Sequence, residues 1–95
     1  MTVTLHLRIA GRVQGVGFRY ALHAEARAGG ISGWVRNRRD GTVEAVVQGS
    51  PQAVEKVLAW AKRGPPAAKV TEVIAQPAPG EFDRTYAGFE QLPTG

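Results

Sequence analysis

The first residues of the chain alternate between apolar and polar side chains. The apolar positions are Val3, Leu5, Leu7 and Ile9. A period of two is typical of a β-strand that buries one of its faces, so the pattern predicts a strand over residues 3–9. Residues 31–37 and 42–48 are also strand-like, and a short connection that contains Asp40 and Gly41 joins them. These two segments are expected to form a β-hairpin.

The polarity of the hairpin residues indicates how its two strands are paired. A two-residue turn would place apolar residues on both faces of the hairpin. A three-residue connection, with Gly41 as a left-handed bulge residue, separates apolar from polar residues better. Arg36 then lies opposite Glu44 and forms a favourable cross-strand charge pair. In this register Asn37 points to the helix-covered side of the sheet, at the end of its strand.

Two segments carry apolar residues at helical spacing instead. The first helix is predicted over residues 19–28 and ends before two glycines. The second begins with Ser50 as a favourable N-cap and Pro51 at the first helical position, and Gly64 ends it. Their apolar stripes are Phe18, Leu22 and Ala26 in the first, and Val54, Val57, Leu58 and Ala61 in the second. His23, on another face of the first helix, is expected to be solvated rather than to act as a base.

The remaining segments complete the order of elements. Residues 68–75 are predicted as a fourth strand and residues 77–84 as a loop, and residues 86–90 are compatible with a short fifth strand. The order β-α-β-β-α-β is typical of an α+β ferredoxin-like sandwich, in which two helices cover one face of an antiparallel sheet. Because the chain has 95 residues of ordinary globular composition, residues 1–95 are expected to form a single domain.

Two strand ends meet at one edge of this predicted sheet. The first and second strands run parallel with the third between them, so their carboxyl ends lie roughly 10 Å apart. The first strand leads into the loop Gly11–Arg19, and the second carries Asn37. A glycine-containing turn that opens onto a helix N-terminus presents unpaired N–H groups and a partial positive charge, which together favour an anion. Arg19 adds donors suited to phosphate, although the same spacing is compatible with a tight structural turn and a solvated arginine.

Charge is distributed unevenly along the chain. The net charge is +4 for the whole sequence, with +6 on residues 1–39 and −2 on residues 40–95. The positive first part favours an anionic ligand, either a phosphate compound or a nucleic-acid backbone. The absence of cysteine excludes disulfides, thiolate metal sites and a cysteine nucleophile. No apolar run reaches the ~20 residues of a membrane span, and no signal-peptide pattern is present, so a cytoplasmic protein without a membrane partner is expected.

Three stretches resemble the acylphosphatase family. Gly11–Arg19, Gly33–Asn37 and Asp40–Glu44 follow the order of that family's motifs, and the resemblance covers nearly the whole chain. It implies a hydrolase without metal or cofactor that converts a small-molecule acyl phosphate into a carboxylate and inorganic phosphate. In the family, the arginine that matches Arg19 binds phosphate, and the asparagine that matches Asn37 positions the attacking water. The backbone amides expected to hold the phosphate oxygens are those of Gln14, Gly15, Val16, Gly17, Phe18 and Arg19.

The C-terminal end of the chain departs from the family pattern. Members commonly finish with a short strand that closes on a basic or aromatic residue. Here Phe89 and Glu90 are followed by residues 91–95, which include Pro93. Proline has no N–H to donate to a sheet, so the sequence leaves the packing of residues 86–95 open.

Two other functions are compatible with this fold and charge. An RNA-recognition module has the same order of elements but binds bases with exposed aromatic side chains on its first and third strands. The corresponding strands of this chain carry none on their expected open face, and Trp34 on the neighbouring strand is the one candidate for stacking. A non-catalytic anion-binding regulatory domain is the second alternative. We expect instead a monomer that acts on a small acyl phosphate and binds no nucleic acid.

Overall fold

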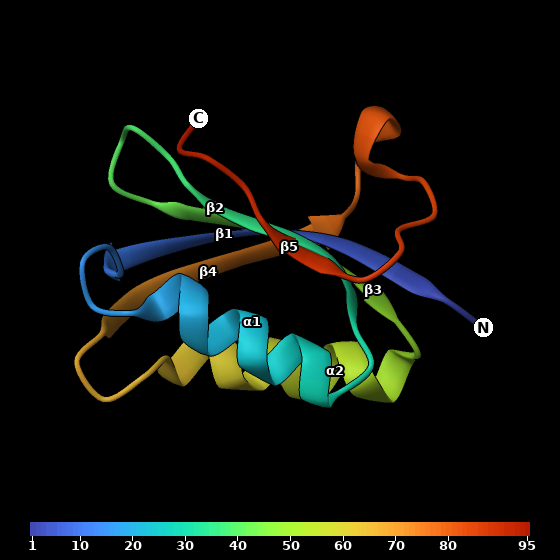
Figure 1. Cartoon of the computed structure of the whole chain (residues 1–95), viewed down its shortest axis with the longest axis horizontal. Coiled ribbons are helices and arrows are strands. Elements are labelled where there is room, and N and C mark those ends of the chain that lie inside the picture. Colours follow the sequence, from blue (N-terminus) through green and yellow to red (C-terminus); the bar gives the residue numbers. More distant parts are fainter.

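The computed structural model describes all 95 residues and contains one five-stranded sheet with two helices on one face (Figure 1). The elements are β1 (Val3–Arg12), α1 (Phe18–Ala28), β2 (Ser32–Asn37), β3 (Val43–Gly49), α2 (Pro51–Arg63), β4 (Lys69–Pro77), a 3₁₀ turn η1 (Gly80–Phe82) and β5 (Phe89–Gln91). The strands lie in the order β4-β1-β3-β2-β5. This arrangement confirms the predicted ferredoxin-like sandwich. It differs from a purely antiparallel sheet because β5 pairs with β2 in parallel.

The hairpin of β2 and β3 has the predicted register. Arg36 lies opposite Glu44 and Asn37 lies opposite Val43. Gly41 has a φ of 92°, a value that residues with a side chain adopt only with strain. The connection is held further by Thr42, whose hydroxyl and N–H both donate to the Asp40 carboxylate. These two hydrogen bonds, the hydroxyl's first, lower the pKa of Asp40.

The hydrophobic core lies between the sheet and the helices. Fifteen buried residues form it, and they include most of the apolar residues predicted to face it. Val3, Leu5 and Leu58 are only partly buried and pack against this core. α2 begins as expected, because the Ser50 hydroxyl accepts a hydrogen bond from the Ala53 N–H and Pro51 takes the first helical position. No helix is both long enough and apolar enough to cross a membrane.

The other face of the sheet is not open, contrary to the expectation from sequence. The segment that follows β4 folds over it, and the Phe82 ring stacks on His6 at 5.6 Å between centroids and meets the Trp34 ring edge-on at 5.4 Å. The Gln48 side chain holds the same segment in place with two hydrogen bonds. Its Nε2 donates to the Arg84 carbonyl, and its Oε1 accepts from the Tyr86 N–H. Trp34 is therefore only 5% exposed and offers no free ring for stacking.

A buried charge cluster lies on the same side of the sheet. Glu44 is 5% exposed, and its carboxylate oxygens lie 2.6 Å from His6 Nε2, 2.7 Å from Arg36 Nε and 3.3 Å from an Arg38 guanidinium nitrogen. Burial by itself raises the pKa of Glu44, but the hydrogen bonds from His6 and Arg36 outweigh burial and hold the pKa below its ordinary value.

The C-terminal segment extends the sheet in spite of Pro93. After β5, the Leu92 N–H donates to the Val35 carbonyl at 2.8 Å, and the Gly95 N–H donates to the Asn37 carbonyl at 3.0 Å. Because the donors are Leu92 and Gly95, the N–H that proline lacks is not needed. β5 also contacts α1, where His23 Nε2 lies 3.1 Å from the carbonyl oxygen of Phe89. The expectation that His23 is a solvated residue was therefore wrong, since the ring is partly buried against β5.

Candidate functional site

The loop between β1 and α1 depends on two glycines with left-handed backbone conformations. Gly15 has a φ of 73° and Gly17 a φ of 79°, and no other residue type in the chain has a positive φ. An added Cβ at either glycine would meet no atom within 4 Å. Glycine is therefore required here for its conformation and not for lack of space. Gly17 is the N-cap of α1, and no side chain caps this helix, which leaves its first N–H groups available to a ligand.

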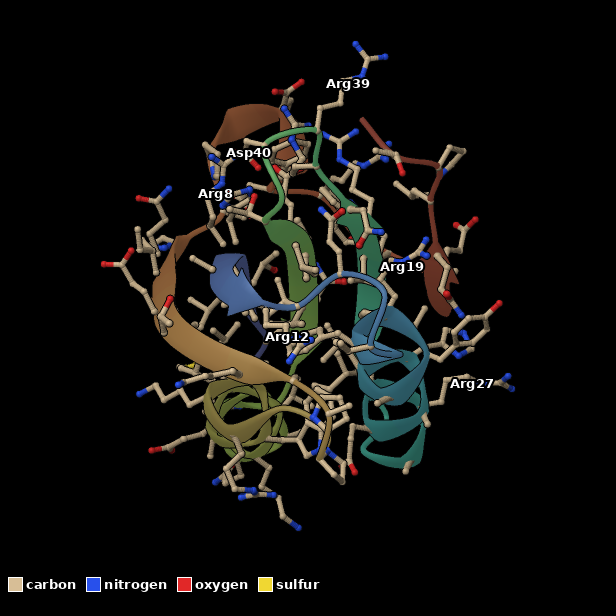
Figure 2. The ribbon with its side chains drawn as sticks, turned by 90° about the vertical axis from the view of Figure 1, so that its left-hand side faces the viewer. Arg8, Arg12, Arg19, Arg27, Arg39 and Asp40 are labelled. Atoms are coloured by element: carbon tan, nitrogen blue, oxygen red, sulfur yellow. The ribbon has the colours of Figure 1, made fainter.

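The loop forms a pocket with the end of β2. The pocket has a volume of about 190 Å³ and is lined by Val13, Gly15, Gly17, Phe18, Arg19, Tyr20 and Asn37. Figure 2 looks onto this end of the molecule and shows Arg19 beside the loop, at the start of α1. The predicted meeting of the two strand ends is thus present, because β1 and β2 both run antiparallel to β3, which lies between them.

The structure brings together most of the residues predicted for the site. Gly15, Gly17, Phe18 and Arg19 line the pocket together with Asn37. Val16 is not part of the lining and packs against the hydrophobic core instead. Gln14 also lies outside the lining, and its side chain forms hydrogen bonds with the hairpin.

Sequence reasoning did not include Val13 and Tyr20, which also line the pocket. Val13 is 1% exposed and forms part of the core, so its place in the wall follows from packing that no local pattern shows. Tyr20 is 71% exposed. An aromatic residue directly after Arg19, on a helix face that does not enter the core, was a usable signal that it borders the site.

The electrostatic character of the pocket is positive. Arg19 is its one charged lining residue, and no carboxylate lines it. The Arg19 guanidinium forms no ion pair with the protein, so its donors are available to an anion. No group of three or more His, Asp or Glu side chains lies close enough together to hold a metal ion.

The side chain of Asn37 has an unsatisfied acceptor. Its Oδ1 atom is the one buried side-chain nitrogen or oxygen in the structure without a hydrogen-bond partner. A buried polar group left unpaired costs about 1–3 kcal/mol, and such groups concentrate where a ligand or a water completes them. The pocket therefore combines a positive anion site with a free acceptor beside it.

Comparisons of the sequence and of the structure with known proteins indicate the same family. The family model Acylphosphatase matches residues 5–91. A protein of Thiobacillus denitrificans called acylphosphatase is 56% identical over 88 residues, which cover 93% of this chain and 94% of the relative. An acylphosphatase of Thermococcus kodakarensis is 61% identical over 71 residues, covering 75% and 78% of the two chains. The crystal structure of acylphosphatase from Bacillus subtilis superposes with a TM-score of 0.88 at 34% identity, and covers 97% of this chain and 99% of that one.

Proposed function

The chain belongs to the acylphosphatase family, and we propose from this premise that it hydrolyses acyl phosphates to a carboxylate and inorganic phosphate. The observation that supports the proposal most directly is the composition of the pocket. It combines a glycine loop at a helix N-terminus, an unpaired arginine and an asparagine with a free acceptor. The loop and the arginine meet one requirement of the reaction, and the asparagine meets the other.

The first requirement is to hold the phosphoryl group. In the proposed complex, N–H groups of the loop and of the first turn of α1 donate to the phosphoryl oxygens, as helix N-termini commonly do. Arg19 donates from its planar guanidinium and neutralises charge as it develops in the transition state. The acyl part of the substrate extends out of the pocket, since only the phosphoryl group has partners within it.

The second requirement is to orient the attacking water. Asn37 Oδ1 accepts a hydrogen bond from this water, which satisfies the acceptor that the protein leaves unpaired. A neutral amide cannot take a proton, so Asn37 acts by positioning. The carboxylate of a mixed anhydride is a good leaving group, and phosphoryl transfer of this kind requires alignment and charge stabilisation more than a strong base.

The bond changes are those of a single displacement. The water oxygen forms a bond to phosphorus, and the bond from phosphorus to the acyl oxygen breaks. The carboxylate leaves with the electron pair of that bond, and the proton of the attacking water passes to a phosphoryl oxygen. The products are the carboxylate and inorganic phosphate.

The test is hydrolysis of benzoyl phosphate by the purified protein, with and without EDTA. We expect turnover that EDTA does not change and that inorganic phosphate and sulfate inhibit by competition. Arg19→Gln should reduce turnover strongly, whereas Arg27→Gln is the matched control, since Arg27 is an exposed arginine of the same helix outside the pocket. Phosphate binding without any hydrolysis by the unmodified protein would identify a non-catalytic anion-binding domain and overturn the proposal.

We also propose that residues 1–95 act as one domain and as a monomer. Support comes from the pocket, whose residues all belong to one chain and lie within residues 13–37. Light scattering on the active protein should give the mass of one chain, 10.2 kDa. A mass twice as large, together with loss of activity when the dimer is dissociated, would contradict a monomeric enzyme.

A further inference from the structure

The side chain of Gln14 connects the glycine loop to the hairpin that carries Asn37. Its Nε2 atom donates to the carbonyl of Arg38 at 2.8 Å and to the carbonyl of Thr42 at 2.9 Å. A primary amide has two N–H groups on this nitrogen, so each of them has a partner. The two acceptors lie on either side of the hairpin connection, directly next to the paired residues Asn37 and Val43.

These two bonds are the one polar link between the loop and the hairpin. No backbone hydrogen bond joins residues 13–17 to residues 37–43, and no other side chain of the loop forms a hydrogen bond with the hairpin. Apart from its two ends in β1 and α1, the loop is therefore held against the hairpin by Gln14 and by nonpolar packing. Packing is less directional than a pair of hydrogen bonds to fixed carbonyls.

We infer, on the premise of the proposed function, that Gln14 is a positioning residue that sets Asn37 relative to the bound phosphoryl group. The expectation from sequence concerned the backbone amide of Gln14. The side chain lies outside the pocket lining and uses both of its donors on the hairpin. Reacting groups must be aligned closely, and a displacement of about 1 Å can reduce the rate about 100-fold. Loss of the link should therefore reduce turnover more than phosphate binding.

Gln14→Met is the variant that tests this role. Methionine has a similar length and no N–H donor, and it introduces no charge near the anion site. The hairpin should remain folded, because the Arg38 carbonyl still accepts from the Gly41 N–H and the Thr42 carbonyl still accepts from the Arg38 N–H. Gln52→Met, at an exposed glutamine of α2, is the matched control.

We expect Gln14→Met to lower kcat by about 10- to 100-fold, with an inhibition constant for inorganic phosphate within about threefold of the unmodified protein. In an Asn37→Ala background the same change should lower kcat by less than about threefold, because residues that act as a unit are strongly non-additive. An equal loss in both backgrounds would overturn the inference, as would a loss seen only as weaker phosphate inhibition. Should Gln14→Met fail to fold, Gln14→Asn, which is one methylene shorter, takes its place in the same measurements.

A second readout does not depend on activity. Asn37 is the only asparagine in the chain, so selective ¹⁵N labelling of asparagine gives a single side-chain amide pair in the NMR spectrum. We expect Gln14→Met to shift this pair and Gln52→Met to leave it in place. An unchanged pair would overturn the inference. If the unmodified protein does not hydrolyse benzoyl phosphate, the proposed function fails, whereas an active protein whose kcat is insensitive to Gln14→Met refutes the inference alone.

Discussion

Arg19 and Asn37 differ in what they offer to a ligand in the same pocket. Arg19 carries a permanent charge without an ion-pair partner in the protein, so in the proposed mechanism it interacts with the phosphoryl group both before and during the reaction. Asn37 is neutral and offers an unpaired acceptor. An unprotonated phosphate oxygen is itself an acceptor, so Oδ1 forms no hydrogen bond with it. The two side chains should therefore affect binding and turnover differently.

Steady-state kinetics with phosphate as inhibitor should separate the two residues. Arg19→Gln should weaken phosphate inhibition and lower kcat, since an arginine in this role can be worth ~10³-fold in rate. Asn37→Ala should lower kcat strongly and leave the inhibition constant for phosphate nearly unchanged. If Asn37→Ala instead lost phosphate affinity and turned over bound substrate normally, Asn37 would be a binding residue.

At the scale of elements, the hairpin of β2 and β3 sets the position of Asn37. Its register depends on a connection in which Gly41 has a φ of 92°. An added Cβ at Gly41 would meet no atom within 4 Å, so a larger residue there is strained only through its backbone conformation. A substitution at Gly41 therefore tests conformational strain without steric overlap.

Gly41→Ala should lower the free energy of unfolding by about 1 kcal/mol, the usual cost of a left-handed conformation for a residue with a Cβ. Gly80→Ala is a matched control, because Gly80 also has open space around it but no positive φ. Urea unfolding of both variants measures the difference. Equal stability of the two variants would mean that the conformation of Gly41 does not hold the hairpin.

The charge cluster around Glu44 makes the stability of the folded protein depend on pH. The pKa of Glu44 is lower in the folded protein than its ordinary value, so the folded state binds this proton less readily than the unfolded state. The stabilising contribution is complete above the unfolded pKa, about 4.3 for glutamate. It is lost as the pH falls through the lower, folded pKa.

Unfolding by urea between about pH 6 and about pH 3 should show this loss. Glu44→Gln should have a flatter dependence below about pH 4.3 than the unmodified protein, because its amide does not titrate. Glu55→Gln, at an exposed glutamate of α2, should keep the original dependence. An identical pH dependence in Glu44→Gln would show that other carboxylates control acid unfolding.

At the scale of the whole molecule, the end that holds the pocket is strongly basic. Figure 2 looks onto this end and shows Arg8, Arg12, Arg19 and Arg39 there, with Asp40 as the labelled acid among them, whereas the labelled Arg27 comes from the last turn of α1. Asp40 is 3.6 Å from Arg8 and offsets one of these charges. A field of one sign around a cleft raises the local concentration of an oppositely charged substrate and the rate of its association.

The value of kcat/KM for benzoyl phosphate should therefore fall between about 0.01 M and about 0.1 M salt, where the screening length shortens from about 30 Å to about 10 Å. Replacing both Arg12 and Arg39 with glutamine should weaken this salt dependence and leave kcat unchanged, since both are exposed and outside the pocket. Lys56→Gln, on α2, is the control. A salt dependence identical to that of the unmodified protein would exclude steering by these arginines.

Local patterns in the sequence determined the elements, most of the sheet and most of the candidate site. Alternation and polarity gave the register of Arg36 with Glu44, because a one-residue slip would turn every apolar side chain out of the core. The loop glycines and Arg19 were also predictable, since the conformation of the loop and the charge at the helix start are properties of adjacent residues.

Only the tertiary structure decided the contacts between distant segments. Gln14 meets the Arg38 carbonyl 24 positions away, His23 meets the Phe89 carbonyl 66 positions away, and Phe82 covers the face that carries Trp34. Periodicity assigns a residue to the buried or exposed side of its own element, but it does not identify the partner from another element. That partner follows from how the elements pack together, because each buried donor, acceptor and ring must find a neighbour in the space that packing leaves.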